Sequence, residues 1–263
     1  MSALLFPGQG SQIVGMGSEL YKNFELVKNI FKSADEQLKY PISKLILEGP
    51  EDELQLTKNT QPAILTVSYS IFRVLKEEFH LNFNSFKFFA GHSLGEYSAL
   101  VCSESLSFGD AIYLLFERGK AMQEAVPVGE GSMIAVLGLE FDKVSDLLKS
   151  KKSDENVCEI ANDNALGQVI LSGNKQGIDN FRIFLKEKKI KSIPLKVSAP
   201  FHCSLMKPAA ERMREKINNI KFKEPLFSIV NNVTAKPETN PDVIKRLLID
   251  QIFSTVKWRE SIL

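Results

Sequence analysis

Short apolar runs alternate with amphipathic segments along most of the chain. An apolar run over residues 3–6 is followed by a glycine-rich loop over residues 7–12. Beyond this loop, apolar residues recur every three or four positions, which places them on one face of a helix. The predicted buried stripe consists of Leu20, Phe24, Val27, Phe31, Ala34 and Leu38. Strands alternating with helices in this way predict an α/β fold with a mostly parallel sheet.

A second helix is predicted to open at Thr60. Threonine is a common N-cap residue, and proline is tolerated in the first turn, where Pro62 would lie. This helix is expected to run towards Phe79. The apolar run at 86–90 then reads as a buried strand.

The strand at 86–90 leads into Gly91-His92-Ser93-Leu94-Gly95, which has the pattern Gly-x-Ser-x-Gly. Between a strand and a helix, this pattern forms a nucleophile elbow. The glycines permit a sharp turn that exposes the serine hydroxyl, and the following helix N-terminus offers N–H groups to an oxyanion. A serine between two glycines can also be a simple turn, but the flanking strand and helix favour covalent acyl chemistry on Ser93.

From about residue 129 the pattern changes to strand, helix, strand, strand, helix, strand, which is the order of a ferredoxin-like unit. The runs are 133–139, 142–149, 157–161, 168–172, 175–187 and 190–197. Proline occurs in the flanking segments 126–129 and 198–200, as is common in connections between domains. We therefore predict a large hydrolase-like α/β domain of residues 1–128 and 198–263. A small ferredoxin-like βαββαβ domain of residues 129–197 is inserted into it, with Ser93 at the floor of a cleft between the two.

The bulk composition is typical of a cytoplasmic enzyme. The chain has 263 residues, of which 44% are hydrophobic and 25% charged, enough to bury a sizeable core. Its net charge of +1 argues against nucleic acid as the main partner. No apolar stretch reaches the ~20 residues of a membrane span, and the apolar run at 3–6 leaves no room for a targeting peptide before it.

Metal and nucleotide cofactors are not expected. Cys102, Cys158 and Cys203 are widely spaced and form no CxxC pair, so neither a zinc site nor a disulfide framework is predicted. Cys203 is expected to be a buried free thiol. Gly8-x-Gly10 lacks the third glycine and the downstream acidic residue of a dinucleotide-binding loop.

A serine nucleophile needs a base, and the chain contains only His80, His92 and His202. His92 is adjacent to Ser93 and is better suited to packing or hydrogen bonding, and His80 reads as a surface residue at a helix end. His202 lies on a loop where the chain re-enters the predicted large domain. A lone loop histidine is often structural, but this position and the need for a base favour His202.

The string Gly-His-Ser-Leu-Gly-Glu-Tyr at 91–97 resembles the active-site signature of malonyl-CoA:acyl carrier protein transacylases and of the acyltransferase domains of fatty acid and polyketide synthases. The segment 198–209 resembles the family's Ser-x-Pro-x-His-x-x-Leu-Met-Lys-Pro-Ala, in which the histidine is the base. The resemblance extends over essentially the whole chain with the motifs in order. Family members continue beyond the segment at 256–261, whereas this sequence stops at Leu263, apparently within a helix.

The resemblance implies roles for residues around the elbow. The segment 116–125 resembles the family's arginine segment, in which the position of Arg118 binds the free carboxylate of the malonyl group. A planar guanidinium suits that task, although arginine followed by Lys120 could otherwise be a solvated face. The loop 6–12 resembles the family loop in which the N–H matching Gln9 joins the N–H matching Leu94 in an oxyanion hole.

Further residues are second-rank assignments from the same resemblance. Phe201 matches a bulky ring that crowds an α-methyl branch, and Asn162, with Asn164 and Gln168, matches a polar loop bordering the cleft. The segment 231–234 resembles a large-domain loop, and Gln251 matches a position whose main-chain carbonyl orients the base. Each asparagine could equally serve in a turn.

The predicted function is transfer of the malonyl group from malonyl-CoA to the phosphopantetheine thiol of acyl carrier protein through a malonyl-serine intermediate, as in fatty acid biosynthesis. No metal or other cofactor is implied, with malonyl-CoA as substrate. Carrier proteins are generally acidic, so Lys186, Lys188, Lys189 and Lys191 are candidates for a basic rim, or else a solvated helix end. Three alternatives remain: a trans-acting acyltransferase of a polyketide pathway, a serine esterase or thioesterase, and a non-catalytic carrier-binding protein.

Overall fold

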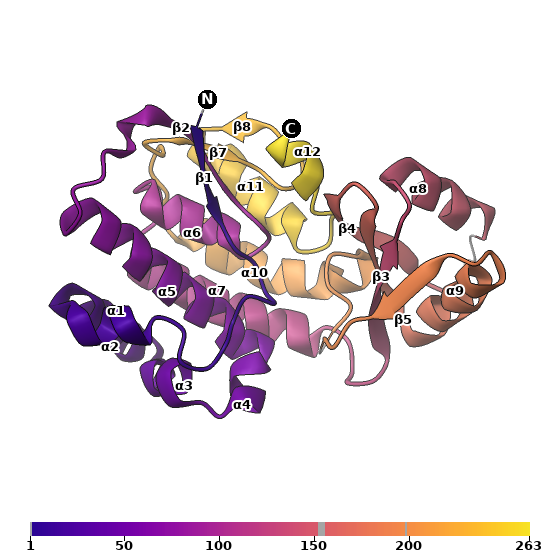
Figure 1. Ribbon diagram of the computed structural model, residues 1–263, viewed down its shortest axis with the longest axis horizontal. Coiled ribbons are helices and arrows are strands. Elements are labelled where there is room, and N and C mark those ends of the chain that lie inside the picture. The colour runs from indigo at the N-terminus through magenta and orange to yellow at the C-terminus, as the bar shows by residue number, and fades with distance from the viewer. Residues whose placement is uncertain (1, 152–155, 198) are drawn as a thin grey trace. The chain divides into compact units, whose positions relative to one another are not determined.

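The computed structural model describes residues 2–151, 156–197 and 199–263 (Figure 1). Ser198, at the predicted return to the large domain, lies outside the described residues. The chain divides into two compact units. Unit 1 comprises Met1–Lys120, Lys216–Asn231 and Lys236–Lys245, and unit 2 comprises Ala121–Glu215, Asn232–Ala235 and Arg246–Leu263.

The secondary structure is a mixture of helices and short strands. The strands are β1 (Ser2–Phe6), β2 (Phe86–Gly91), β3 (Gly131–Leu137), β4 (Cys158–Ala165), β5 (Gln168–Asn174), β6 (Lys191–Pro194), β7 (Ser228–Val230) and β8 (Pro237–Glu238). The α-helices are α1 (Ser18–Asn23), α2 (Glu25–Leu38), α3 (Ile42–Glu48), α4 (Glu51–Gln55), α5 (Thr57–Glu77), α6 (Gly95–Cys102), α7 (Phe108–Glu124), α8 (Phe141–Ser150), α9 (Lys175–Glu187), α10 (Lys207–Asn219), α11 (Pro241–Gln251) and α12 (Trp258–Ile262). Short 3-10 turns are η1 (Phe83–Ser85) and η2 (Ser204–Met206).

Unit 1 contains a mostly parallel sheet in the order β1-β2-β7-β8. The strands β1, β2 and β7 are parallel, and only β8 is antiparallel to its neighbour. Phe89 of β2 is fully buried and stacks on Phe227, and α6 packs against β1 and β2. The α/β class, the mostly parallel sheet and the strands expected at 3–6 and 86–90 are thus confirmed.

The first predicted helix is two helices. The chain is extended at Phe24, with φ −125° and ψ 119°, so α1 ends and α2 begins there. The Asn23 side chain donates to the Glu19 carbonyl oxygen (2.7 Å), a local bond that competes with the helical backbone. The buried part of the predicted stripe lies in α2, at Val27, Phe31 and Ala34.

The second predicted helix begins earlier than the sequence indicated. The backbone N–H of Thr60 donates to Leu56 O (2.9 Å), so Thr60 already lies inside α5 and the prediction of an N-cap there is wrong. Its hydroxyl donates instead to Leu54 O (2.6 Å), the last turn of α4. Pro62 also lies within α5 rather than in its first turn.

Unit 2 contains an antiparallel sheet in the order β4-β5-β3-β6. Figure 1 shows α8 and α9 on one side of its strands. The core between them is apolar, as predicted from the runs in this region. It consists of Ile134, Val136, Val144, Val169, Leu171, Ile178, Phe181 and Leu185.

The polar segment predicted as a loop at 161–168 is mostly strand. β4 continues to Ala165, and the turn is confined to residues 166–167. Asparagine and aspartate are depleted in strands, so the sequence did not predict this part of β4 as a strand. Its register shifts between Ile160 and Asn162, and Asn162 pairs in parallel with Val256. A second chain segment therefore supports the irregular end of β4.

Other global features constrain the function classes. Over the described residues, no helix is both long and apolar enough to cross a membrane. The same residues contain no group of three or more His, Cys, Asp or Glu side chains arranged to hold a metal ion. All three cysteines are free thiols.

Candidate active site

The turn after β2 has the geometry of a nucleophile elbow. Ser93 has φ +53°, a left-handed conformation that non-glycine residues rarely adopt. A Cβ on Gly91 would lie 1.9 Å from the Gly95 carbonyl carbon, and one on Gly95 would lie 2.6 Å from Phe6 O. Only glycine fits at either position, so both glycines are required for the turn. Ser93 itself is buried, with 9% of its surface exposed, rather than exposed as the sequence predicted.

The N-terminus of α6 and the loop after β1 meet at this elbow. Leu94 is the N-cap of α6, and the first N–H groups of a helix have no acceptor within the helix. The loop after β1 packs closely here, since a Cβ on Gly8 would lie 2.7 Å from His92 O. Gln9 follows in this loop, and its side-chain amide is 3.5 Å from Thr57 Oγ1. The predicted oxyanion donors at Gln9 and Leu94 thus belong to two segments that both contact the elbow.

Arg118 of α7 lies beside Ser93 in the interior of unit 1. Its side chain is only 1% exposed, so it is not part of a solvated face. One guanidinium nitrogen, Nη2, donates to Ser93 Oγ (3.2 Å), and Nη1 donates to Gln61 Oε1 (2.8 Å). These two bonds orient the guanidinium towards the nucleophile.

Other buried polar groups surround Arg118. Burial lowers the pKa of Arg118, while the nearby Tyr97 and Glu96 raise it. An arginine remains protonated in proteins even so. Burial raises the pKa of Tyr97 to about 12. Glu96 is fully buried and accepts a hydrogen bond from Asn231 Nδ2 (2.5 Å). The positive charge of Arg118 is therefore held in a low-dielectric site, where an anion would be bound strongly.

His202 lies in unit 2 and its ring is oriented by the backbone. The Nδ1 atom of His202 is 2.8 Å from Gln251 O, which is the contact that the family resemblance implied. A carbonyl oxygen can only accept, so Nδ1 donates the hydrogen in this contact, which makes Nε2 the acceptor nitrogen of a neutral imidazole. The Gln251 side chain in turn donates to Asn232 Oδ1 (3.3 Å). This arrangement suits a general base without a third acidic residue.

The residues around His202 are also buried. Phe201 and Asn162 are 7% and 6% exposed. Cys203 is buried, and its thiol donates to Pro200 O (3.2 Å). Burial raises the pKa of Cys203 to about 11, and the expectation of a buried free thiol is confirmed. His80 is exposed just after α5, as predicted.

The predicted residues fall into two groups. Ser93, Leu94, Gln9 and Arg118 belong to unit 1, and His202, Phe201, Gln251 and Asn162 belong to unit 2. Sequence reasoning missed the roles of Gln61 and Glu96 in the first group. Each is a polar residue beside an apolar helical run, at 62–65 and 97–102, and that isolation is the signal that could have identified them.

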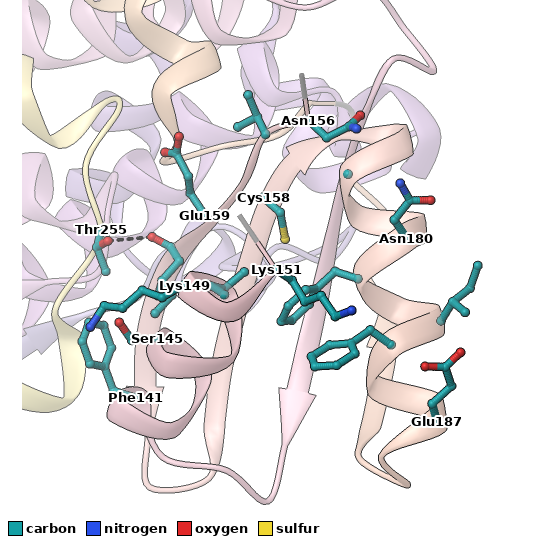
Figure 2. Close-up of a pocket in the computed structure, with 17 residues that line it drawn as sticks. Phe141, Ser145, Lys149, Lys151, Asn156, Cys158, Glu159, Asn180, Glu187 and Thr255 are labelled. Carbon is teal, nitrogen blue, oxygen red and sulfur yellow. Dashed lines mark hydrogen bonds between the residues drawn. The ribbon is translucent and has the colours of Figure 1, made fainter. Parts of the chain in front are cut away.

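A separate groove of about 810 Å³ lies in unit 2 between α8, α9 and β4 (Figure 2). Its walls include three phenylalanines, Phe141, Phe181 and Phe184, and its rim includes Lys149 and Lys151. None of the candidate residues named above is among the described residues that line it. The groove is therefore distinct from the candidate active-site residues.

Comparison with known proteins gives a consistent family. Residues 3–263 match the acyl transferase domain family. A malonyl CoA-acyl carrier protein transacylase of Bacillus subtilis is 44% identical over 261 residues, covering 99% of this chain and 81% of that protein.

Solved structures agree. An acyl-carrier-protein-S-malonyltransferase from Bartonella henselae has a TM-score of 0.95 and 42% identity, covering 100% of this chain and 84% of that chain. A type II PKS acyl-carrier protein in complex with its malonyl-transacylase has a TM-score of 0.92 and 40% identity, covering 97% of this chain and 82% of that chain.

Proposed function

The chain belongs to the acyl transferase domain family, and from this premise we propose that it transfers malonyl groups from malonyl-CoA to acyl carrier protein. The proposal is carried by one observation: a buried arginine donates to the hydroxyl of the elbow serine. A guanidinium binds a carboxylate through two parallel N–H bonds, and the malonyl group carries a free carboxylate. The malonylated carrier is the form consumed in fatty acid biosynthesis.

In the proposed first half-reaction, Ser93 Oγ attacks the malonyl thioester carbonyl while His202 Nε2 takes its proton. The N–H groups of Gln9 and Leu94 stabilise the oxyanion, and Arg118 binds the malonyl carboxylate. The C–S bond breaks, and CoA leaves as a thiol with the proton from His202. The product is malonyl-Ser93.

In the second half-reaction the phosphopantetheine thiol of the carrier gives its proton to His202 and attacks malonyl-Ser93. The ester C–O bond breaks, and Ser93 Oγ recovers the proton. Gln251 O holds His202 in the tautomer that both steps need. Neither step requires a metal or redox cofactor.

The remaining assignments are parts of the same proposal. Phe201 crowds an α-methyl branch and so favours malonyl over methylmalonyl groups, and Asn162 borders the acyl site. We assign residues 1–128 and 198–263 to a hydrolase-like domain and residues 129–197 to an inserted ferredoxin-like domain. The strand order β4-β5-β3-β6 supports the ferredoxin-like assignment. The three free thiols fit a reducing cytoplasm.

A carrier protein of a polyketide pathway is the second candidate partner. It is favoured by the similarity to the malonyl-transacylase in complex with a type II PKS carrier. The chemistry on the enzyme would be the same. A serine esterase or thioesterase is disfavoured, because a buried arginine beside the nucleophile would face a neutral acyl chain.

The direct test is intact-mass analysis after mixing the protein with malonyl-CoA. We expect one malonyl group per chain, located on Ser93 by peptide mapping, and its removal when holo acyl carrier protein is added. A labelled chain that cannot pass its malonyl group to a fatty acid carrier, but does so to a polyketide carrier, would favour the second candidate. An unlabelled chain would contradict both transferase functions and favour a non-catalytic carrier-binding protein.

The bond between Arg118 and Gln61 gives a prediction about substrate binding. Gln61→Glu keeps the size of the side chain but places a carboxylate 2.8 Å from Nη1, in competition with the malonyl carboxylate. Losing a charge-assisted bond costs about 1.5–3 kcal/mol, so KM for malonyl-CoA should rise roughly ten- to hundredfold. Steady-state kinetics with malonyl-CoA measure this rise.

A matched control is Gln37→Glu, the same change at an exposed position of α2 in the same unit. It should leave KM unchanged. An unaltered KM in Gln61→Glu would show that a carboxylate at position 61 does not compete with the malonyl carboxylate for Arg118.

A further inference from the structure

The loop that carries His202 has an unusual backbone and a short link to a helix. His202 has φ +57°, a left-handed conformation that disfavours side chains other than those of glycine, asparagine and aspartate. Two residues later, Ser204 begins η2, which leads directly into α10. A strained residue keeps its conformation only where the surrounding structure holds it, so the contacts on either side of His202 decide where its ring lies.

Glu159 of β4 makes two contacts to this loop. Its Oε2 accepts the backbone N–H of Ser204 (2.9 Å), and its Oε1 accepts the Ser204 hydroxyl (2.5 Å). In Figure 2 the Glu159 carboxylate points away from the Cys158 thiol, as expected for successive residues of a strand. Both carboxylate oxygens of Glu159 therefore bond to Ser204, in the loop that carries His202.

The chemistry of these contacts makes them strong. A carboxylate that accepts an N–H at the start of a helical segment satisfies a donor that has no helical acceptor and interacts favourably with the helix dipole. The Ser204 hydroxyl adds a second hydrogen bond to an ionised acceptor, which is stronger than one between neutral groups. A rigid sheet strand thus holds the residue two positions after His202.

The β4 strand is itself anchored near Glu159. Thr255 donates to the carbonyl oxygen of the next residue, Ile160 (2.6 Å), as the dashed line in Figure 2 shows. Val256 N donates to Ala161 O (2.8 Å), and Asp163 N donates to Val256 O (3.0 Å). The segment at 255–256 follows Gln251, whose carbonyl orients the His202 ring. Glu159 thus holds the backbone after His202, and Gln251 holds its ring. Glu159 lies in β4, and the segment that follows Gln251 is hydrogen-bonded to the same strand.

We propose that Glu159 is a positioning residue for the base: through Ser204 it holds the His202 backbone so that Nε2 meets the nucleophile in both half-reactions. This inference rests on the function proposed above. It adds a residue that the sequence did not single out, and it predicts an effect on the rate of the chemistry rather than on malonyl-CoA binding.

The test uses the full chain with Glu159→Ala, Glu159→Gln, Ser204→Ala and the double variant Glu159→Ala/Ser204→Ala. The measurement is the single-turnover rate of Ser93 malonylation at saturating malonyl-CoA, with KM and the thermal midpoint recorded alongside. A misplacement of about 1 Å costs up to ~100-fold, so we expect Glu159→Ala to slow malonylation roughly ten- to hundredfold with KM unchanged. Glu159→Gln keeps one acceptor oxygen and should recover part of the rate.

Ser204→Ala removes the hydroxyl but keeps the N–H, so it should slow malonylation less than Glu159→Ala, and the double variant should be no slower than Glu159→Ala alone. Ser204→Ala also keeps the inference testable if Glu159→Ala does not fold. The matched control is Glu187→Ala, an exposed glutamate at the end of α9 on the same groove, which should have the wild-type rate.

Three results would overturn the proposal: a wild-type malonylation rate in Glu159→Ala, a loss of rate that only follows the loss of folded protein, or effects of Glu159 and Ser204 that simply add. Failure of the wild-type chain to become malonylated would instead contradict the proposed function. The two failures are therefore distinguishable in one experiment.

Discussion

Ser93→Ala is expected to abolish acyl transfer while leaving the fold intact. The variant lacks the only atom proposed to carry the malonyl group, whereas the turn depends on Gly91 and Gly95, which remain. Alanine also has the same Cβ as serine, so the left-handed backbone at this position bears no additional strain. Intact-mass analysis with malonyl-CoA should show no added group, and thermal unfolding should be close to wild type. A malonylated Ser93→Ala chain would place the nucleophile elsewhere.

His202→Ala should slow acyl transfer without abolishing it, in contrast to Ser93→Ala. Removal of a general base slows a reaction by about 100- to 10,000-fold, and both half-reactions should slow because His202 serves in each. His80→Ala is the matched control, since His80 is exposed after α5. Equal turnover in His202→Ala and His80→Ala would move the base to another residue.

The elbow could be predicted from the sequence because its determinants are local. The apolar run before Gly91 predicts a strand, and the sterics of two glycines four residues apart predict the turn. The structure has the same short-range causes: the Gly91 position tolerates no Cβ against Gly95, and the Gly95 position tolerates none against the end of β1. Features of this kind need no knowledge of the rest of the fold.

The errors in the predicted helices and strands came from tertiary contacts, which the conformational preferences of single residue types do not include. Threonine is a residue type that favours an N-cap. In the structure, however, the backbone N–H of Thr60 bonds to Leu56 and its hydroxyl bonds to Leu54, so α5 starts earlier. Asparagine is a residue type that favours turns, but Asn162 lies in a strand and pairs with Val256, which is remote in the sequence. Local preference and tertiary pairing disagreed, and tertiary pairing prevailed.

The site residues show the same division. The role predicted for Arg118 came from family resemblance, because its neighbours Glu117 and Lys120 read as a charged surface. In the structure Arg118 donates hydrogen bonds to Gln61, 57 residues earlier, and to Ser93, 25 residues earlier. The contact of Glu159 with Ser204 joins residues 45 apart. Pairings at such distances are set by the topology of the whole fold and could not be read from one sequence.

Arg118→Ala should change the acyl specificity of the enzyme. Malonyl transfer should collapse, because the variant loses charge-assisted bonds to the malonyl carboxylate worth about 1.5–3 kcal/mol each. With two such bonds, kcat/KM for malonyl-CoA should fall on the order of 100-fold or more. Acetyl-CoA has no carboxylate to bind, so its transfer should fall far less, and it should improve if the buried charge of Arg118 opposes a neutral acyl group.

The measurement is kcat/KM for malonyl and acetyl thioesters in wild type, Arg118→Ala and the matched control Lys120→Ala. Lys120 lies on the same helix but is exposed, so its removal should leave the ratio of the two substrates unchanged. Arg118→Lys keeps a positive charge but not the planar pair of donors, and its malonyl activity should lie between those of wild type and Arg118→Ala. If malonyl and acetyl transfer fall by the same factor in Arg118→Ala, the guanidinium supports Ser93 or the fold in general. The ratio of the two substrates therefore separates a carboxylate-binding arginine from a structural one.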